Sequence, residues 1–111
     1  MTDDYQKLMT QKRFLGEIEQ AMRGVNRELI HQNIPVIDKN KVIALAKAVG
    51  HLRARYLEAA FRLGLDENDP VPDKPTIEEL KNRRVNYQEA RQAFEALREA
   101  IEKGYVDIAG L

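Results

Sequence analysis

The pattern with the clearest chemical meaning is Glu28-Leu29-Ile30-His31, a Glu-x-x-His pair. Carboxylate-bridged di-iron bundles place such pairs on inward helix faces, and they need a second copy of the pair and two more carboxylates. This chain has no second copy, and Leu29 faces the apolar side of its helix while His31 points away from it. We therefore predict no metal site and interpret His31 as a surface residue near a helix end, where its charge suits the helix dipole.

Two other patterns could carry chemistry, and both fail on their spacing. His51 lies on a charged helix side with no acid four residues away and no cysteine or serine partner. The segment from Asp66 to Asp73 begins like an EF-hand calcium loop, but Pro70 falls where the third oxygen ligand is required and the loop glycine is missing. The sequence therefore predicts no enzyme, no catalytic residue and no cofactor.

The charges of the chain balance, which removes the usual argument for a nucleic-acid partner. Lys plus Arg and Asp plus Glu each number 18 in 111 residues, a length typical of one domain, so we expect a single helical domain over residues 1–111. The sequence has no cysteine, which excludes disulfides and favours a reducing compartment, most simply the cytoplasm. No signal peptide and no membrane span are predicted.

Three amphipathic segments predict an all-α fold. Residues 3–32 carry apolar side chains at three- and four-residue intervals, and these form the seam of the first helix: Leu8, Leu15, Ile18, Met22, Val25 and Leu29. The second helix, residues 39–63, has a seam of its own: Val42, Leu45, Val49, Leu52, Tyr56, Ala59 and Leu63. The seam of the third helix, residues 76–103, is Leu80, Tyr87, Ala90, Phe94, Leu97 and Ile101. An acidic, proline-rich loop over residues 64–75 and an apolar tail over 104–111 complete the chain.

Cap residues set the predicted helix ends. Pro35 disfavours helical geometry in the residue before it and so ends the first helix, and Asp38 is the expected N-cap of the second. Thr76 and Glu79 match a capping box at the start of the third helix. Each of the last two helices is followed by a C′ glycine, Gly64 or Gly104. The short connection after the first helix predicts that the second helix runs antiparallel to it, and we expect three helices in up-down-up order.

Three helices can cover both apolar sides of the second helix on most of its length, but they leave one surface of the third helix without a partner. The second helix has a second apolar side next to its seam, which places it between two neighbours: Ile43, Ala46, Gly50, Leu57, Ala60 and Phe61. The third helix has a stripe of small residues without a partner: Ala93, Ala96 and Ala100. A second chain, packed across a two-fold axis, would cover this stripe. We therefore predict a bundle that is completed by homodimerisation.

Polar residues inside the seams are the candidate interaction residues, because they cost stability and fix helix register or the choice of partner. Matching heights in antiparallel helices place Arg53 beside Glu19 of the first helix and beside Asn86 and Tyr87 of the third. We predict a partly buried polar cluster of these four residues. Binding of an anionic ligand or of a partner's acidic side chain is the alternative to this packing role. A second pair of polar seam residues is Gln11 and Arg83.

Two functions are compatible with these patterns. The first is a non-enzymatic interaction or scaffolding module that self-associates or binds another protein with an acidic or apolar helix. The second is a nucleic-acid-associated regulator that uses a basic strip on the second helix: Lys47, Arg55 and Arg62. Glu58 interrupts this strip, and no aromatic side chain is interleaved with it for base stacking. We therefore predict the interaction module, and nucleic acid is not the expected partner.

Overall fold

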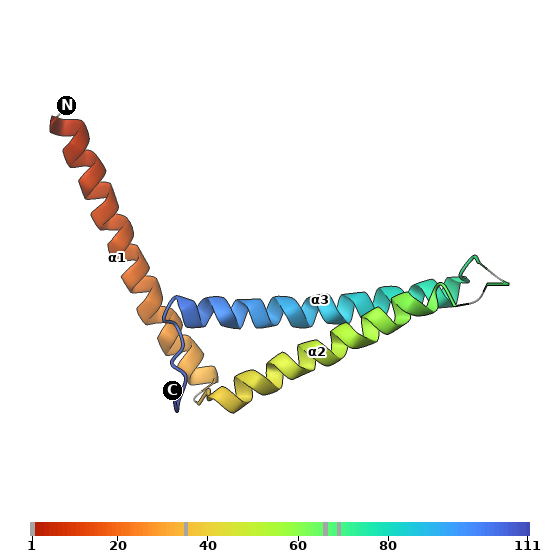
Figure 1. Cartoon of the computed structure of the whole chain (residues 1–111). Helices are drawn as coiled ribbons and strands as arrows, with labels where there is room; N and C mark the ends of the chain where they lie inside the picture. The colour runs from red at the N-terminus through yellow and green to blue at the C-terminus, as the bar shows by residue number, and fades with distance from the viewer. Residues whose placement is uncertain (1, 35, 66, 69) are drawn as a thin grey trace. The chain divides into compact units, whose positions relative to one another are not determined.

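The chain folds into three α-helices, with no β-strand among the residues that the structure describes, 2–34, 36–65, 67–68 and 70–111 of a computed structural model (Figure 1). The helices are α1 (Thr2–Asn33), α2 (Lys39–Arg62) and α3 (Lys74–Glu102). They account for 79% of the structure, which confirms the predicted all-α class. The predictions made on Pro35 and on the loop acids Asp66 and Asp69 lie outside the described residues.

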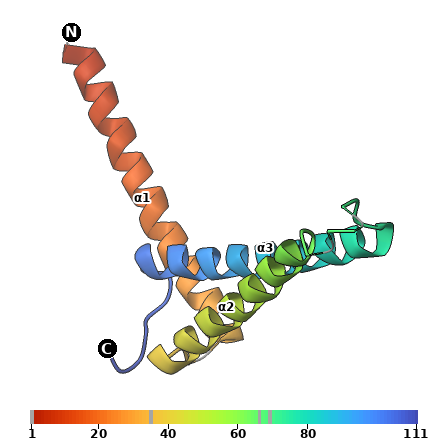
Figure 2. The ribbon, with the colours of Figure 1, turned by 45° about the vertical axis from the view of Figure 1, so that its right-hand side comes forward.

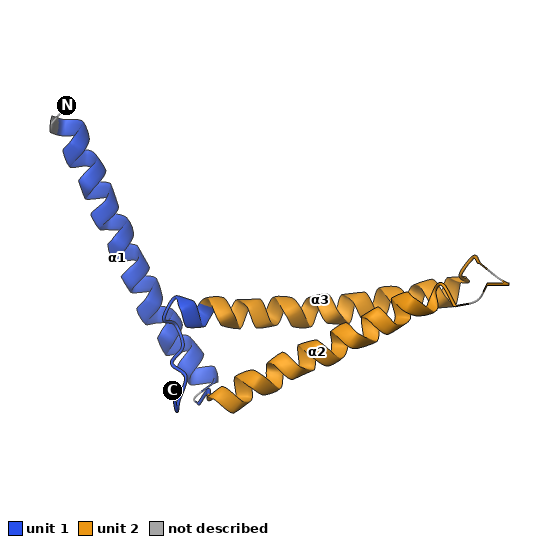
Figure 3. Ribbon diagram, viewed as in Figure 1, with its two compact units in different colours: residues 1–37, 100–111 blue, residues 38–99 orange. Residues whose placement is uncertain are grey.

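Two compact units make up the chain, and they are described separately (Figure 3). Unit 1 combines Met1–Ile37 with Ala100–Leu111, which joins α1 to the last turn of α3 and to the tail. Unit 2 is Asp38–Glu99, which holds α2 and most of α3. A single domain, an antiparallel arrangement of the first and second helices, and dimerisation stay predictions.

Unit 2 is a hairpin of two antiparallel helices, which run side by side in both views (Figures 1 and 2). Every predicted seam residue of α2 is buried or half-buried, and Val49 is the most enclosed of them at 7% exposure. The predicted seam residues of α3 that belong to unit 2 are half-buried as well. This pairing follows from the spacing of the apolar residues, because positions three and four apart share one helix face.

Only one apolar side of α2 is covered within unit 2. On the second side Ile43, Leu57 and Phe61 are 40%, 54% and 81% exposed, so the predicted placement of this helix between two neighbours does not hold for unit 2. The small residues Ala93 and Ala96 of α3 are exposed too. A hairpin of two helices has one interface, and both surfaces lie outside it.

Both ends of α2 lie at or next to the predicted residues. The carboxylate of Asp38 accepts the backbone N–H of Lys41 at 2.8 Å, which makes Asp38 the N-cap. Gly64 follows the helix, but among the described residues only Gly104 and Gly110 have a positive φ. Gly64 therefore lies at the predicted C′ position, directly after the C-cap Leu63, but without a left-handed backbone. The chain leaves α2 through hydrogen bonds between residues three apart instead.

The predicted capping box of α3 is also wrong, because the helix begins at Lys74 and its N-cap is Asp73. The carboxylate of Asp73 accepts the backbone N–H of Thr76 at 2.9 Å and also binds its hydroxyl. These hydrogen bonds lower the pKa of Asp73. Pro75 fits the first turn because the N–H that it lacks would have no helical partner there. Glu79 does not cap the helix and binds an arginine one turn later.

Candidate interaction surfaces

The first surface is an exposed apolar row along α1. Its residues occupy the a and d positions of a heptad repeat, the pattern of helices that pack on other helices. We call this row the α1 seam: Leu8, Gln11, Leu15, Ile18, Met22, Val25 and Leu29. Its apolar members range from 38% exposed at Ile18 to 59% at Leu15. Tyr5, Met9 and Phe14 add further exposed apolar surface beside it. Unit 1 therefore leaves the seam of its long helix open.

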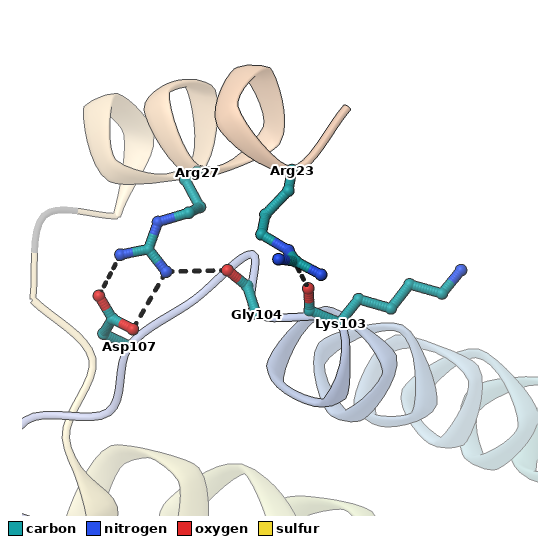
Figure 4. A network of polar contacts seen from close by, with 5 residues as sticks. All are labelled: Arg23, Arg27, Lys103, Gly104 and Asp107. Atoms are coloured by element: carbon teal, nitrogen blue, oxygen red, sulfur yellow. Dashed lines mark hydrogen bonds and ion pairs between the residues drawn. The ribbon is translucent and has the colours of Figure 1, made fainter. Parts of the chain in front are cut away.

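A different face of α1 holds the C-terminal tail (Figure 4). Arg23 Nε donates to the Lys103 carbonyl at 3.2 Å, and Arg27 Nη1 donates to the Gly104 carbonyl at 2.8 Å. The Asp107 carboxylate binds both terminal nitrogens of Arg27, one of them at 3.1 Å. At 3.6 residues per turn, Arg23 lies about 110° and Arg27 about 150° around the helix from the middle of the α1 seam. The tail thus does not compete with the seam for the same face.

A tight turn after α3 directs the tail to that face. The Tyr105 N–H donates to the Ala100 carbonyl at 2.8 Å, and the Gly104 N–H donates to the Ile101 carbonyl at 3.1 Å. This pair of bonds is a Schellman motif, and it needs the left-handed backbone that Gly104 adopts at φ 74°. The prediction of Gly104 as a C′ glycine is therefore confirmed.

Further along, the tail packs against the segment that follows α1. The Ala109 N–H donates to the Ile37 carbonyl at 2.8 Å, and Ile37 and Val106 are each only 9% exposed. An open hollow of about 520 Å³ beside them is lined by mixed side chains that include His31 and Tyr105. Burial of these two apolar residues, rather than the polar contacts, is the main stabilising term.

The ion pair between Arg27 and Asp107 sets the position of the tail more than its stability. Hydrogen bonding to Arg27 lowers the pKa of Asp107, and the same contact raises the pKa of Arg27. The two side chains are 43% and 77% exposed, so water screens their attraction. A planar guanidinium that binds a carboxylate through two nitrogens nevertheless fixes the orientation of that carboxylate.

The second surface is a cluster of arginine and tyrosine side chains on unit 2. Arg53 Nε donates to Tyr87 Oη at 3.1 Å, and the guanidinium lies over the Tyr87 ring, 5.2 Å from its centroid. The Tyr56 ring stacks on Tyr87 with centroids 6.0 Å apart. Arg91 reaches the same ring, with its guanidinium carbon 6.0 Å from the centroid. Tyr87 is thus in contact with two cations and a second ring.

Of the four residues predicted to cluster, the structure brings Arg53 and Tyr87 together. Asn86 is exposed next to Tyr87, and Arg53 is itself exposed. Glu19 belongs to α1 in unit 1, so its pairing with Arg53 stays a prediction. Sequence reasoning missed Tyr56 and Arg91 as members. Tyr56 occupies a seam position at the height of Tyr87, and Arg91 follows Tyr87 by four residues, so both could have been found from the sequence.

Among the other predicted polar residues, two arginines are paired with an acid of their own helix. Arg83 is half-buried and binds Glu79 through Nε at 3.1 Å and Nη2 at 2.8 Å. Gln11 lies in the α1 seam of unit 1, and its role in fixing helix register or partner choice stays a prediction. In the basic strip, Lys47 and Arg55 are exposed, whereas Arg62 binds Glu58 at 2.7 Å. One of the three cations in this strip is therefore already paired with an acid.

Metal ligands do not converge in the part of the chain that the structure describes: no three His, Cys, Asp or Glu side chains lie so that they could hold an ion. None of the described helices combines the length and apolar character that crossing a membrane requires. Neither a protein-family model, nor a curated protein, nor a solved structure matches the chain. The function of the chain is therefore inferred from its two exposed surfaces.

Proposed function

We propose that this protein is a non-enzymatic helical interaction module that self-associates through the α1 seam by coiled-coil packing. The observation that supports the proposal is an apolar heptad row that is exposed along a helix whose other face is occupied by the tail. Contiguous exposed apolar surface of this kind is typical of protein interaction sites. A heptad spacing is typical of a helical partner.

The length of α1 supports the same proposal. The helix has 32 residues, which is about 48 Å, and the polar contacts of the tail with it begin at Arg23. A helix gains most of its stability from packing of an apolar face, and isolated helices are marginal in water. A second helix on the α1 seam would supply this packing for the N-terminal turns. A second copy of the chain or another protein with an acidic or apolar helix could provide it, in the cytoplasm as the absence of cysteine suggests.

Regulation through nucleic acid is the competing proposal, and it finds less support. The basic strip on α2 has Arg62 already bound to Glu58. The nearby cations Arg53 and Arg91 both lie at the Tyr87 ring, which is stacked on Tyr56. Binding by such a strip would weaken steeply with added salt. Submicromolar binding to random duplex or single strands at physiological salt would favour the regulator over the module.

Light scattering at about 100 μM, well above usual dimer dissociation constants, tests self-association. We expect twice the chain mass of 12.8 kDa for the wild type and monomers for Leu15→Lys, because a charge in the seam opposes packing. The matched control is Leu57→Lys, since Leu57 is similarly exposed at 54% against 59% but lies on α2. A monomeric wild type, or dissociation by the control alone, would contradict the proposal.

A further inference from the structure

We propose that the partner of the α1 seam is the α1 seam of a second copy of this chain, packed antiparallel so that Leu15 meets Val25 of the second copy and Ile18 meets Met22 of the second copy. This inference rests on the proposed function and adds to it the identity, orientation and register of the partner helix.

The register follows from the order of residues in the seam. In an antiparallel pair, a positions of one helix pack on d positions of the other. When the numbers of paired residues add up to about 40, every seam residue has a partner within α1, and the four kinds of layer are Leu8–Gln32, Gln11–Leu29, Leu15–Val25 and Ile18–Met22. A shift of one heptad in one direction packs Leu29 against Asp4, and in the other it carries Leu8 past the end of α1. The polar Gln layers then lie toward the two ends, and the apolar layers lie at the centre.

The orientation follows from the charges beside the seam. Lys7 and Glu28 both flank it on one edge (position g), and Lys12 flanks it on the other (position e). Equal edges face each other in an antiparallel pair, so Lys7 faces Glu28 of the second copy, twice by symmetry. In a parallel pair Lys7 faces Lys12 of the second copy, which are like charges. All three side chains are exposed, and none of them forms an ion pair among the described residues.

Within unit 1 the face required for this contact is exposed. Arg23 and Arg27, which hold the tail, lie on another side of α1, and Met22 of the seam, which borders a hollow with Lys103 and Tyr105, is still 50% exposed. The other occupant to consider is α2 of the same chain, whose second apolar side is uncovered. That arrangement would be monomeric and would couple Glu19 to Arg53, which makes it an outcome of the test below.

Disulfide trapping decides the orientation, because the chain contains no cysteine of its own. We would prepare Ile18→Cys and Met22→Cys separately, then oxidise each alone and as a mixture under non-denaturing conditions. The antiparallel register predicts that the mixture forms a disulfide between the two variants and that each variant alone forms little dimer. A parallel pair predicts the reverse, since Met22→Cys would then meet its own copy.

Exchanging the charges of Lys7 and Glu28 gives a second test. The expected change in the dissociation constant of the dimer has opposite signs for the two orientations. Lys7→Glu should weaken the dimer about fivefold if the helices are antiparallel, because two attractive pairs become repulsive. The double variant Lys7→Glu/Glu28→Lys should restore the wild-type dissociation constant. In a parallel pair Lys7→Glu strengthens the dimer, because it creates an attraction to Lys12 of the second copy, and the second substitution adds nothing. Far-UV circular dichroism of each variant verifies that helix content is kept.

The outcomes separate the inference from the proposed function. Mixed disulfides together with rescue by the double variant support the antiparallel pair. A dimer in which Met22→Cys links to itself and Lys7→Glu tightens binding overturns the orientation but leaves the self-associating module in place. A monomeric wild type in which the effects of Glu19→Gln and Arg53→Ala on unfolding are not additive overturns both, in favour of closure of α1 on α2 within one chain.

Discussion

Gly104 should be the position where a single methyl group most disturbs the docking of the tail. Its φ is +74°, a left-handed conformation that costs a residue with a side chain about 1–2 kcal/mol. An added Cβ would lie 3.6 Å from Arg23 Nε and 3.7 Å from Arg23 Cδ, both ordinary contacts, so crowding adds nothing. Because alanine also restricts the unfolded chain, about 0.4–1 kcal/mol is recovered. The net expectation for Gly104→Ala is a destabilisation of about 1 kcal/mol.

Native-state hydrogen exchange of the Ala109 amide measures this cost, since that amide is bonded to the Ile37 carbonyl when the tail is docked. We expect exchange about fivefold faster in Gly104→Ala. The matched control is Gly24→Ala in the same unit, where a Cβ meets nothing within 4 Å and no positive φ applies. This control should stabilise α1 by about 0.5–1 kcal/mol. Equal exchange in both variants would refute the left-handed turn as the element that directs the tail.

Three further predictions concern the hairpin and the tail. Val49→Ala should cost unit 2 about 1–2 kcal/mol in urea unfolding, whereas Leu57→Ala should stay within about 0.5 kcal/mol because Val49 is enclosed and Leu57 is exposed. Tyr87→Phe should cost about 0.5–1 kcal/mol in the same assay, because Arg53 loses its hydrogen-bond acceptor at the surface but keeps its contact with the ring. An unchanged free energy of unfolding in both Tyr87→Phe and Arg53→Ala would argue against the contact. The lowered pKa of Asp107 means that its contribution to docking is complete above the ordinary carboxyl pKa and is lost as the pH falls through the lower folded value. Amide NMR shifts of the tail should follow that titration, and Asp107→Asn should abolish it.

The hairpin could be predicted from the sequence because its determinants are local. The spacing of Val42, Leu45 and Val49 fixes which side of α2 is apolar, and matching heights then place Arg53 level with Tyr87. Periodicity does not say what covers an apolar side. The second side of α2 was expected to be packed because it is apolar, but it is exposed within unit 2.

The contacts of the tail were beyond reach of the same reasoning. Arg23 and Arg27 lie off the seam and look like solvated cations in a sequence pattern, yet they bind backbone carbonyls about 80 residues away. A carbonyl acceptor carries no residue-specific signal. The one usable sign was Gly104 after the third helix, which marks a change of direction but not its destination. Asp73 as a cap was missed because Thr76 offered a better-known motif three residues later.

The assignment of the two chain ends to one unit has a consequence for synthesis. Unit 2 is continuous in sequence, Asp38–Glu99, so its helices can pair as soon as both have left the ribosome. Unit 1 must wait for Gly104 and Asp107, which are translated long after α1. During that interval α1 is a nascent segment without its tail, and its apolar row is the surface it offers to chaperones and to neighbouring chains on the same messenger RNA. The proposed self-association through the α1 seam would then begin before folding is complete.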